Sequence, residues 1–399
     1  MASVILVSGA PGAHATGQGN QAHLIYATNS GRWWLFYLSS TQTLATAYSA
    51  DFVTWTAGGT LTLAHVHSSE GQNLSVCYAN IGSTDVVHVA VSYESTNGSS
   101  GHIRATISGT TITFAAEFQC GTALGSGGVD GVAVMRDAGG FIYHGTGFIS
   151  SINTDFGETT FATADTSGAS WTHGTETDTH ITTVGGAVNS HALLSLGSGA
   201  ALGLGDNSTV NNILWSKWNG STWSPTSSNN VLASNVTGNY NQWGTCRLSD
   251  TDVHFVYQSS TNTFTHRRFN GTSWGNGNTI PTLTFKSQAG VAMISDGTSV
   301  WMFCIASAAG NAIQYIKWSA GVWDAAWSTL ESTSQTRNNV SVCPQIQNGK
   351  ISVIWTEGSS PFNIVGEQLN IGGAVTPPFI GMIQSSDMLA GMMSGGVSG

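Results

Sequence analysis

The chain has 399 residues, of which only 8% are charged, and its 21 acidic and 11 basic side chains give a formal net charge of −10. So few Lys and Arg residues exclude the basic surface with which proteins neutralise nucleic-acid phosphates or anionic membranes. Fifty glycines and 14 tryptophans favour strands and tight turns over helices, and no segment has the roughly 20 consecutive apolar residues that cross a bilayer.

Residues 1–20 hold one predicted strand, SVILVSG, which starts at Ser3. Met1–Gly12 lacks a basic region, and the apolar run Val4–Val7 is too short for a signal peptide, so Sec-dependent export is not predicted. In a ring-shaped fold the two chain ends commonly meet. The strand then completes the last sheet of the ring, or else it lies outside the ring.

A repeat occupies residues 21–371. Each copy is a strand, a short polar turn and an aromatic-rich strand, and the copies start at Leu24, Leu74, Val132, His191, Gly244, Val291 and Val340. The start positions are 47 to 59 residues apart, close to the spacing of roughly 40 to 50 residues known for propeller blades. The sequence therefore predicts an all-β fold, a β-propeller of about seven four-stranded antiparallel blades, with six or eight blades also compatible.

A hairpin motif recurs late in the copies, as two apolar residues five positions apart around a polar turn. Clear copies are Ile107 with Ile112, Trp218 with Trp223, Phe269 with Trp274, and Trp318 with Trp323. Looser copies run from Tyr48 to Trp55, from Phe161 to Trp171 and from Leu369 to Val375. The Asn-Gly pairs at 219–220 and 270–271 supply the positive φ angles of a tight hairpin, so the flanking rings point to one face of the sheet.

The Trp-x-Gly-x-x-Trp form at Trp218–Trp223, and its weaker forms at Phe269–Trp274 and Trp318–Trp323, resemble the hairpins of propeller lectins of the tachylectin and bacterial fucose-binding kinds. The resemblance implies sugar stacking on Trp223, Trp274 or Trp323 in clefts between blades. The alternative is that these rings pack one blade on the next, since aromatic rings bury a large apolar area.

Two further segments, Ser49–Trp55 and Thr163–Trp171, resemble degenerate Asp-boxes, the turn motif of sialidase propellers. Their tryptophans follow the aspartate by four and six positions instead of five, and Trp55 and Trp171 join the candidate ligand-binding residues. A sialidase also needs three converging arginines and a pair of carboxylates, whereas here the arginines are scattered and nothing in the spacing pairs the glutamates. No catalytic residues are predicted.

Metal and cysteine chemistry offer weak patterns. Side chains of the kind that bind metals occur in two places, at His65, His67 and Glu70 and in the segment His173–His180 with Glu176 and Asp178. The alternative to a metal site is that these are ordinary surface histidines. No metal or other cofactor is predicted. Five widely spaced cysteines favour buried free thiols, with Cys77, Cys246 and Cys343 on inner strands.

The C-terminal segment 372–399 is apolar and rich in Gly and Met, after Pro377 and Pro378. One interpretation is an arm that docks on a partner subunit, and the other is a frayed terminus. The docking residues would be Phe379, Ile380, Met382, Ile383, Met388, Leu389, Met392 and Met393.

These features together favour a non-enzymatic structural or adhesion protein in the virion of a tailed bacteriophage, as a fibre, tail or head-decoration component that binds a host surface or glycan. Its partners would be other virion subunits, or further copies of itself through the arm. One alternative is a free-standing carbohydrate-binding lectin, secreted or at the cell surface without a Sec signal. A second is a glycan hydrolase of the sialidase-like propeller type.

Overall fold

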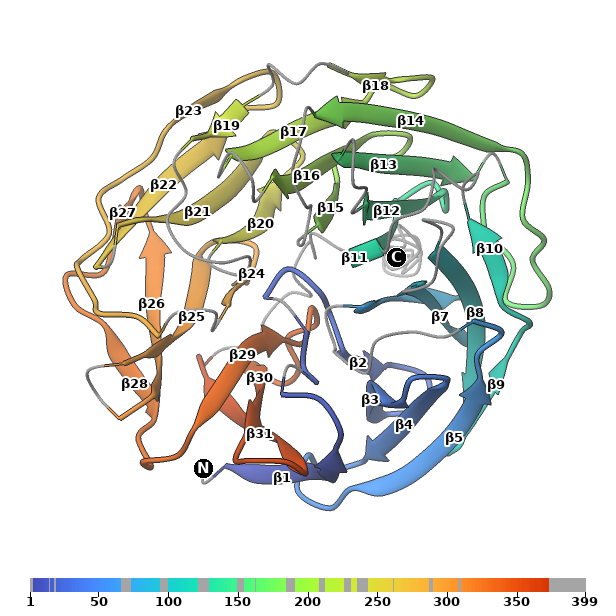
Figure 1. The fold of residues 1–399 in the computed structure, drawn as a ribbon, viewed down its shortest axis with the longest axis horizontal. Helices are drawn as coiled ribbons and strands as arrows, with labels where there is room; N and C mark the ends of the chain where they lie inside the picture. Colours follow the sequence, from blue (N-terminus) through green and yellow to red (C-terminus); the bar gives the residue numbers. More distant parts are fainter. Residues whose placement is uncertain are drawn as a thin grey trace, which may run out of the picture.

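The computed structural model shows an all-β ring of seven sheets, each forming one blade around a common axis (Figure 1). It describes residues 3–13, 15–17, 19–65, 73–93, 100–120, 129–148, 154–161, 163–183, 191–207, 212–225, 231–234, 243–260, 262–286, 290–307 and 310–372. The predicted docking arm therefore lies outside the described residues, apart from Gly372. Within the described ranges, no helix has the length and apolarity to cross a membrane.

The first three blades follow one another along the chain. Blade 1 contains β2 (Leu24–Ala27), β3 (Arg32–Ser40), β4 (Thr43–Ser49) and β5 (Thr56–Thr62). Blade 2 contains β6 (Leu74–Ile81), β7 (Thr84–Ser92), β8 (Ser100–Ser108), β9 (Thr111–Phe114) and β10 (Phe118–Cys120). Blade 3 contains β11 (Val129–Arg136), β12 (Ile142–Phe148), β13 (Thr154–Phe161) and β14 (Glu176–Thr183).

The next three blades repeat this antiparallel order. Blade 4 contains β15 (His191–Ser195), β16 (Ala201–Asn207), β17 (Asn212–Trp218), β18 (Trp223–Ser224) and β19 (Val231–Ala233). Blade 5 contains β20 (Trp243–Ser249), β21 (Asp252–Ser260), β22 (Thr263–Phe269) and β23 (Trp274–Asn276). Blade 6 contains β24 (Val291–Ser295), β25 (Val300–Ala306), β26 (Ala312–Ser319), β27 (Val322–Trp323) and β28 (Ser328–Glu331).

Blade 7 joins the two ends of the chain. It contains β29 (Arg337–Val342), β30 (Lys350–Glu357) and β31 (Phe362–Asn370), and its outer strand is β1 (Val4–Ala10), which pairs antiparallel with β31 (Figure 1). The N-terminal strand thus completes the last sheet, and the ring needs no exposed edge where its ends meet.

The inner strands confirm the predicted repeat. They begin at residues 24, 74, 129, 191, 243, 291 and 337, within three residues of each predicted start, and the predicted count of seven blades is confirmed. The tight hairpins also form as predicted, because Asn219 Oδ1 accepts hydrogen bonds from the backbone N–H groups of Ser221 and Thr222. Gly220, at φ 99°, supplies the left-handed conformation that this turn requires.

The N-terminal segment crosses from the outer strand β1 to the inner strand β2 and meets several inner strands on its way (Figure 1). Asn20 bonds through both side-chain polar atoms to blade 5, with Nδ2 donating to Trp243 O and Oδ1 accepting from Thr245 N, each at 3.1 Å. Gln21 Nε2 donates to Val132 O of blade 3 at 2.8 Å. This segment therefore ties blades 3 and 5 together at the axis as an internal plug.

Candidate ligand-binding groove on blade 5

The structure does not bring the five candidate tryptophans together, because each belongs to a different blade or blade interface. Trp223 and Trp323 are only 2% and 6% exposed, so neither ring presents a face on which a sugar could stack. For these two residues the predicted sugar stacking is corrected, because their buried rings pack one blade on the next. Trp274, Trp55 and Trp171 are half-buried against the core, and Trp274 contacts Phe269 at a ring-centroid distance of 5.2 Å.

The two Asp-box-like segments differ in what their aspartates do. Asp51 Oδ1 accepts hydrogen bonds from the backbone N–H groups of Val53 and Thr54, at 2.8 and 2.7 Å, and so closes a local turn. Asp165 instead is fully buried and forms an ion pair with Arg104 of the neighbouring blade. The second segment therefore makes a contact between blades, and Trp171 Nε1 closes it locally by donating to Thr163 O.

The candidate metal ligands are separated. His65 stacks on Tyr93, and its Nδ1 lies 3.9 Å from Glu117, whereas His173 bonds to His102. His67 and Glu70 lie outside the described residues, and Glu176, Asp178 and His180 lie on β14. Among the residues that the structure describes, no group of three or more His, Cys, Asp or Glu side chains is arranged to hold a metal ion. All five cysteines are free and buried.

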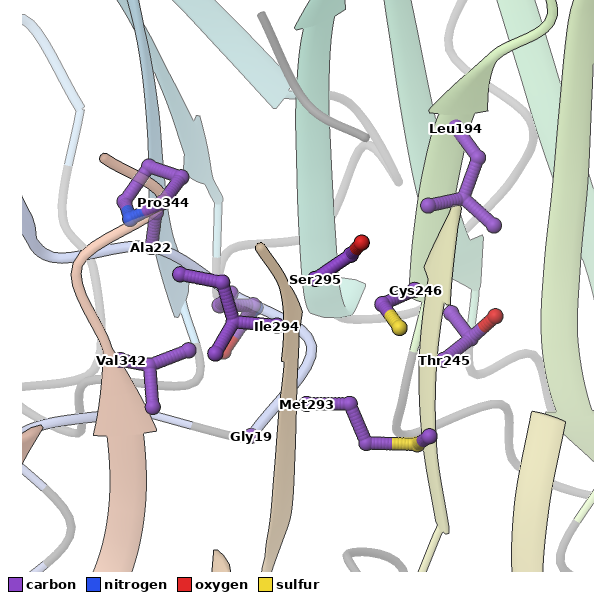
Figure 2. Close-up of a pocket in the computed structure, with 11 residues that line it drawn as sticks. Gly19, Ala22, Leu194, Thr245, Cys246, Met293, Ile294, Ser295, Val342 and Pro344 are labelled. Atoms are coloured by element: carbon purple, nitrogen blue, oxygen red, sulfur yellow. The ribbon is translucent and has the colours of Figure 1, made fainter. Parts of the chain in front are cut away.

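A small pocket at the axis lies between the plug and the inner strands. Figure 2 shows Thr245, Cys246, Met293 and Val342 around it, with Gly19 of the plug at its edge. Its volume of about 40 Å³ suits a few water molecules, which is far below the size of a sugar ring site. Among the described residues, this pocket at the axis is therefore too small for a sugar.

Blade 2 carries a buried cluster of histidine and arginine on its face toward blade 3. His88 on β7 lies directly opposite Arg104 on β8, and His88 Nδ1 lies 3.0 Å from His102 Nε2. Asp165 Oδ2 joins the two strands, at 3.1 Å from His88 Nε2 and 2.6 Å from Arg104 Nε. The His88 and Asp165 side chains are fully buried, and that of Arg104 is only 6% exposed.

Blade 5 repeats this cluster at the same strand positions. His254 on β21 lies directly opposite Arg268 on β22, and His254 Nδ1 lies 3.0 Å from His266 Nε2. Asp252 corresponds to Asp165, and its Oδ1 lies 3.4 Å from His254 Nε2 and 3.0 Å from Arg268 Nε. The two blades thus share the set of two histidines, one arginine and one carboxylate.

The hydrogen bonds around His266 fix the direction in which protons are donated along the row His266, His254 and Asp252. His266 Nδ1 accepts from the backbone N–H of Asn278 at 2.9 Å and from Trp323 Nε1 at 3.2 Å, so it carries no proton. His266 Nε2 then donates to His254, and His254 Nε2 directs its proton to Asp252. Burial lowers the pKa of His266 to about 3, and the ring stays neutral.

Asp252, the carboxylate that ends this series of hydrogen bonds, is ionised. Burial works to raise the pKa of Asp252, but hydrogen bonds from His254 and Arg268 outweigh it and lower that pKa to about 2. Arg268 holds the carboxylate with two donors, since its Nη2 bonds to Oδ2 at 2.6 Å while Nε bonds to Oδ1. The guanidinium also lies over the ring of Trp318, with 5.0 Å to the centroid, and this fixes its plane.

The two clusters differ in exposure, because a longer loop covers the one in blade 2. Phe161 and Trp171 of blade 3 stand ten positions apart, whereas Trp318 and Trp323 of blade 6 stand five apart around a tight hairpin. The loop Thr163–Ser170 therefore reaches Arg104, and the blade-6 hairpin leaves 40% of the Arg268 side chain exposed.

A polar groove of about 530 Å³ opens over Arg268, and we call it the blade-5 groove. Gly275, which pairs with Arg268 across β22 and β23, adds no side chain in front of the guanidinium. The groove combines a charged donor, one carboxylate, two amides and two hydroxyls, which is a set suited to hydrogen-bonding a polar ligand. It is lined by Ser249, Thr251, Asp252, Arg268, Phe269, Asn270, Gly275 and Asn276.

Of the candidate residues, only Trp274 is close in sequence to this groove, through its neighbours Gly275 and Asn276. The arginine and histidines were not among the predicted site residues. The signal was present in the repeat, because His102-x-Arg104 and His266-x-Arg268 occupy the same strand of their copies, with His88 and His254 on the strand before.

No family model matches the chain, and no curated protein matches it. Among solved structures, the polysaccharide lyase Uly1 is 9% identical, with a TM-score of 0.52 over 86% of this chain and 88% of that one. The Aleuria aurantia lectin in complex with alpha-methyl-L-fucoside is 14% identical, with a TM-score of 0.45 over 77% of this chain and 92% of that one. The NanB sialidase from Streptococcus pneumoniae is 12% identical, with a TM-score of 0.47 over 91% and 71%. Both classes named from the sequence, propeller lectins and sialidases, occur among these structures, and likeness at such identities concerns the fold alone.

Proposed function

We propose that this protein is a non-enzymatic carbohydrate-binding propeller that takes its glycan in the blade-5 groove. The observation that carries the proposal is the exposed Arg268–Asp252 pair, held in a fixed plane by Trp318 and His254 at the wall of a polar groove. Sugar hydroxyls both donate and accept hydrogen bonds, so they match a wall that offers guanidinium, carboxylate, amide and hydroxyl groups together. Pre-oriented polar groups reduce the entropy cost of binding.

Binding without cleavage is favoured by the number of carboxylates. Glycoside hydrolysis uses a pair of Asp or Glu side chains on either side of the scissile bond. Among the described residues that line the groove, Asp252 is the one carboxylate, and it is already engaged by Arg268 and His254. The hydrolase alternative would need a second acid within the same groove.

A glycan array tests this function. The full chain is compared with Arg268→Gln, which keeps a polar side chain but removes the charge and the fork of donors, and with Arg32→Gln, which makes the same charge change in blade 1. Losing a charge-assisted hydrogen bond weakens binding by about 10- to 100-fold. We expect that loss for Arg268→Gln alone. If no glycan binds the wild-type chain, the proposed function is wrong.

We further propose that the propeller is part of a virion, as a structural or adhesion component of a tailed bacteriophage. The low share of charged residues and the abundance of Gly support this placement, as does the apolar segment 372–399 as an arm for other virion subunits or for self-association. Light scattering on the full chain and on a chain ending at Gly372 tests the arm. Assembly of the full chain alone supports the virion role, whereas two glycan-binding monomers favour a free-standing lectin.

A further inference from the structure

The loop Thr163–Ser170 of blade 3 lies against Arg104 of blade 2. The groove of blade 5 leaves the corresponding space beside Arg268 open. The Asp165 carboxylate of the loop holds Arg104 Nε and Nη2, at 2.6 and 3.4 Å. Two of the loop's backbone carbonyls accept two further bonds, with Arg104 Nη1 donating to Ala169 O and Nη2 to Ser167 O, both at 2.9 Å. The arginine of this repeat is therefore completed by one carboxylate and two amide carbonyl oxygens.

In blade 5 the carboxylate is already provided by the blade itself. Asp252 holds Arg268 Nε and Nη2 as Asp165 holds Arg104, at 3.0 and 2.6 Å. No described residue accepts from Arg268 Nη1, and the blade-6 hairpin that follows Trp318 is shorter than the loop that reaches Arg104. What blade 2 has and blade 5 lacks from its own chain is the pair of amide carbonyls.

The loop also shows what shape fits beside this arginine. Gly168 stands between the two carbonyl-bearing residues and packs closely on Thr84, since a Cβ built on it would lie 2.5 Å from Thr84 Oγ1. The group that bonds to Arg104 in blade 2 is thus a short stretch of backbone amides, and Gly168 at its middle has no side chain. The corresponding hairpin of blade 5 contributes Ser249 and Thr251 to the groove.

From this internal comparison we propose that the blade-5 groove selects glycans that carry an acetamido group, whose amide carbonyl accepts from Arg268 Nη1. The inference rests on the proposed function and names its ligand class. N-acetylated sugars offer the same acceptor that Ser167 and Ala169 offer to Arg104, on a group of similar size. An acidic sugar is disfavoured, because Asp252 already occupies the bidentate edge of the guanidinium and would face a second carboxylate.

The other charged groups near the groove have partners of their own. Lys217 Nζ donates to Gly271 O, Arg267 Nη1 donates to the Asn276 side chain, and Arg247 pairs with Asp250. Arg268 therefore lines the groove with Nη1, and with the second N–H of Nη2, left without an acceptor among the described residues.

The test uses matched oligosaccharides that differ in one group. Chitotriose and cellotriose are both neutral and β1,4-linked, and they differ in an acetamido group against a hydroxyl at C2; N-acetylgalactosamine and galactose form a second pair, and a glucuronate-terminated trisaccharide is the acidic probe. Calorimetry on the full chain is expected to give at least 10-fold tighter binding of one acetamido member than of its partner. Arg268→Gln and Arg268→Lys should abolish that preference, while Arg32→Gln should keep it.

The outcomes separate the two proposals. If hydroxyl and acetamido members bind equally, or the acidic probe binds more tightly, and binding still depends on Arg268, then the glycan function stands and the acetamido inference is overturned. If a preference is found that Arg268→Lys retains in full, the amide is recognised elsewhere and the inference is again overturned. If no sugar binds at all, the proposed function itself fails.

Discussion

His254 Nδ1 and His266 Nε2 lie 3.0 Å apart in blade 5, in two rings that stack at 17° and are buried from solvent. The same spacing joins His88 to His102 in blade 2. Two imidazoles at this distance share one proton between their facing nitrogens, so charging both would place two like charges in contact. The clusters are therefore built for neutral histidine.

This geometry predicts that acid destabilises the protein well above the pH range where Asp165 and Asp252 titrate. Burial lowers the pKa of His88, His102 and His254, and it lowers that of His144 and His266 to about 3. A histidine in the unfolded chain has a pKa of about 6.5, so the unfolded chain takes up protons first as pH falls. Each buried histidine then lowers the free energy of unfolding by up to about 1.4 kcal/mol per pH unit below that value. The contribution is complete above about pH 6.5 and is lost as pH falls toward the folded pKa.

Urea denaturation at pH 7.5, 6 and 5 measures this effect. Asp165 and Asp252 serve as an internal control, because their pKa values are lowered and their contribution is lost only below about pH 4. Burial raises the pKa of Glu367 to about 7, so its protonation in the folded state partly offsets the histidine effect over this range. A free energy of unfolding that stays constant between pH 7.5 and 5 would contradict the neutral-histidine interpretation.

The two arginines of the repeat should respond differently to the same change. Arg104→Met leaves Asp165 buried without its cation, and breaking such a pair costs about 3 to 5 kcal/mol of stability. Arg268→Met breaks an exposed pair, for which the cost is about 0 to 1 kcal/mol. Thermal and urea unfolding of both variants measures the difference, and equal losses would refute the distinction between a covered and an open cluster.

Asn20→Ala should loosen the plug at the axis. The substitution removes both hydrogen bonds to blade 5 and leaves the Trp243 carbonyl and the Thr245 amide without that partner, at a cost of about 2 to 3 kcal/mol. Asn29→Ala is the matched control, since Asn29 is exposed and its loss should cost less than about 0.5 kcal/mol. Similar values for the two variants in urea denaturation would show that the plug adds no stability.

Removing β1 should open the ring. Without residues 1–10, β31 becomes an unpaired edge, and the apolar side chain of Leu6, only 4% exposed, no longer covers blade 7. We expect a lower midpoint of thermal unfolding and aggregation in size-exclusion chromatography with light scattering. A chain shortened instead after Gly372 serves as the control, and an unchanged midpoint without β1 would show that blade 7 is stable alone.

The thiols should be inert while the protein is folded. All five cysteines are buried, and burial raises the pKa of Cys77, Cys246, Cys304 and Cys343, which disfavours the reactive thiolate. A thiol reagent should modify none of them under native conditions and all five in denaturant. Rapid labelling of the native protein would place one of these side chains in contact with solvent.

The repeat could be predicted from the sequence because each blade buries its own strands through local patterns. The turn at Asn219-Gly220 and the start of each inner strand depend on residues adjacent in the chain, and these were predicted correctly. The burial of Trp223 could not be predicted in this way, because the same hairpin leaves Trp274 half-buried, and what covers each ring is the neighbouring blade. Spacing within one copy does not contain that information.

The candidate site was hidden for a similar reason. Asp165 completes a cluster whose arginine lies 61 positions earlier, and its Asp-box-like sequence suggested a local turn. The open copy at Arg268 becomes visible as a site only by contrast with the closed one at Arg104. Two copies of one motif, with loops of different length in the next blade, carry the information that neither copy holds alone.

The path of the N-terminal segment also determines when the molecule can be completed. Val4 pairs with Gly366, so β1 must remain unpaired until almost the whole propeller has been synthesised. The plug that follows it bonds to strands of blades 3 and 5, which are also made later. Closure of the ring and sealing of its axis are therefore late, non-local events, and such contacts make folding slow. During translation, β1 and the plug stay without their partner strands at the same time, and a chaperone that shields these segments would raise the yield of the folded protein.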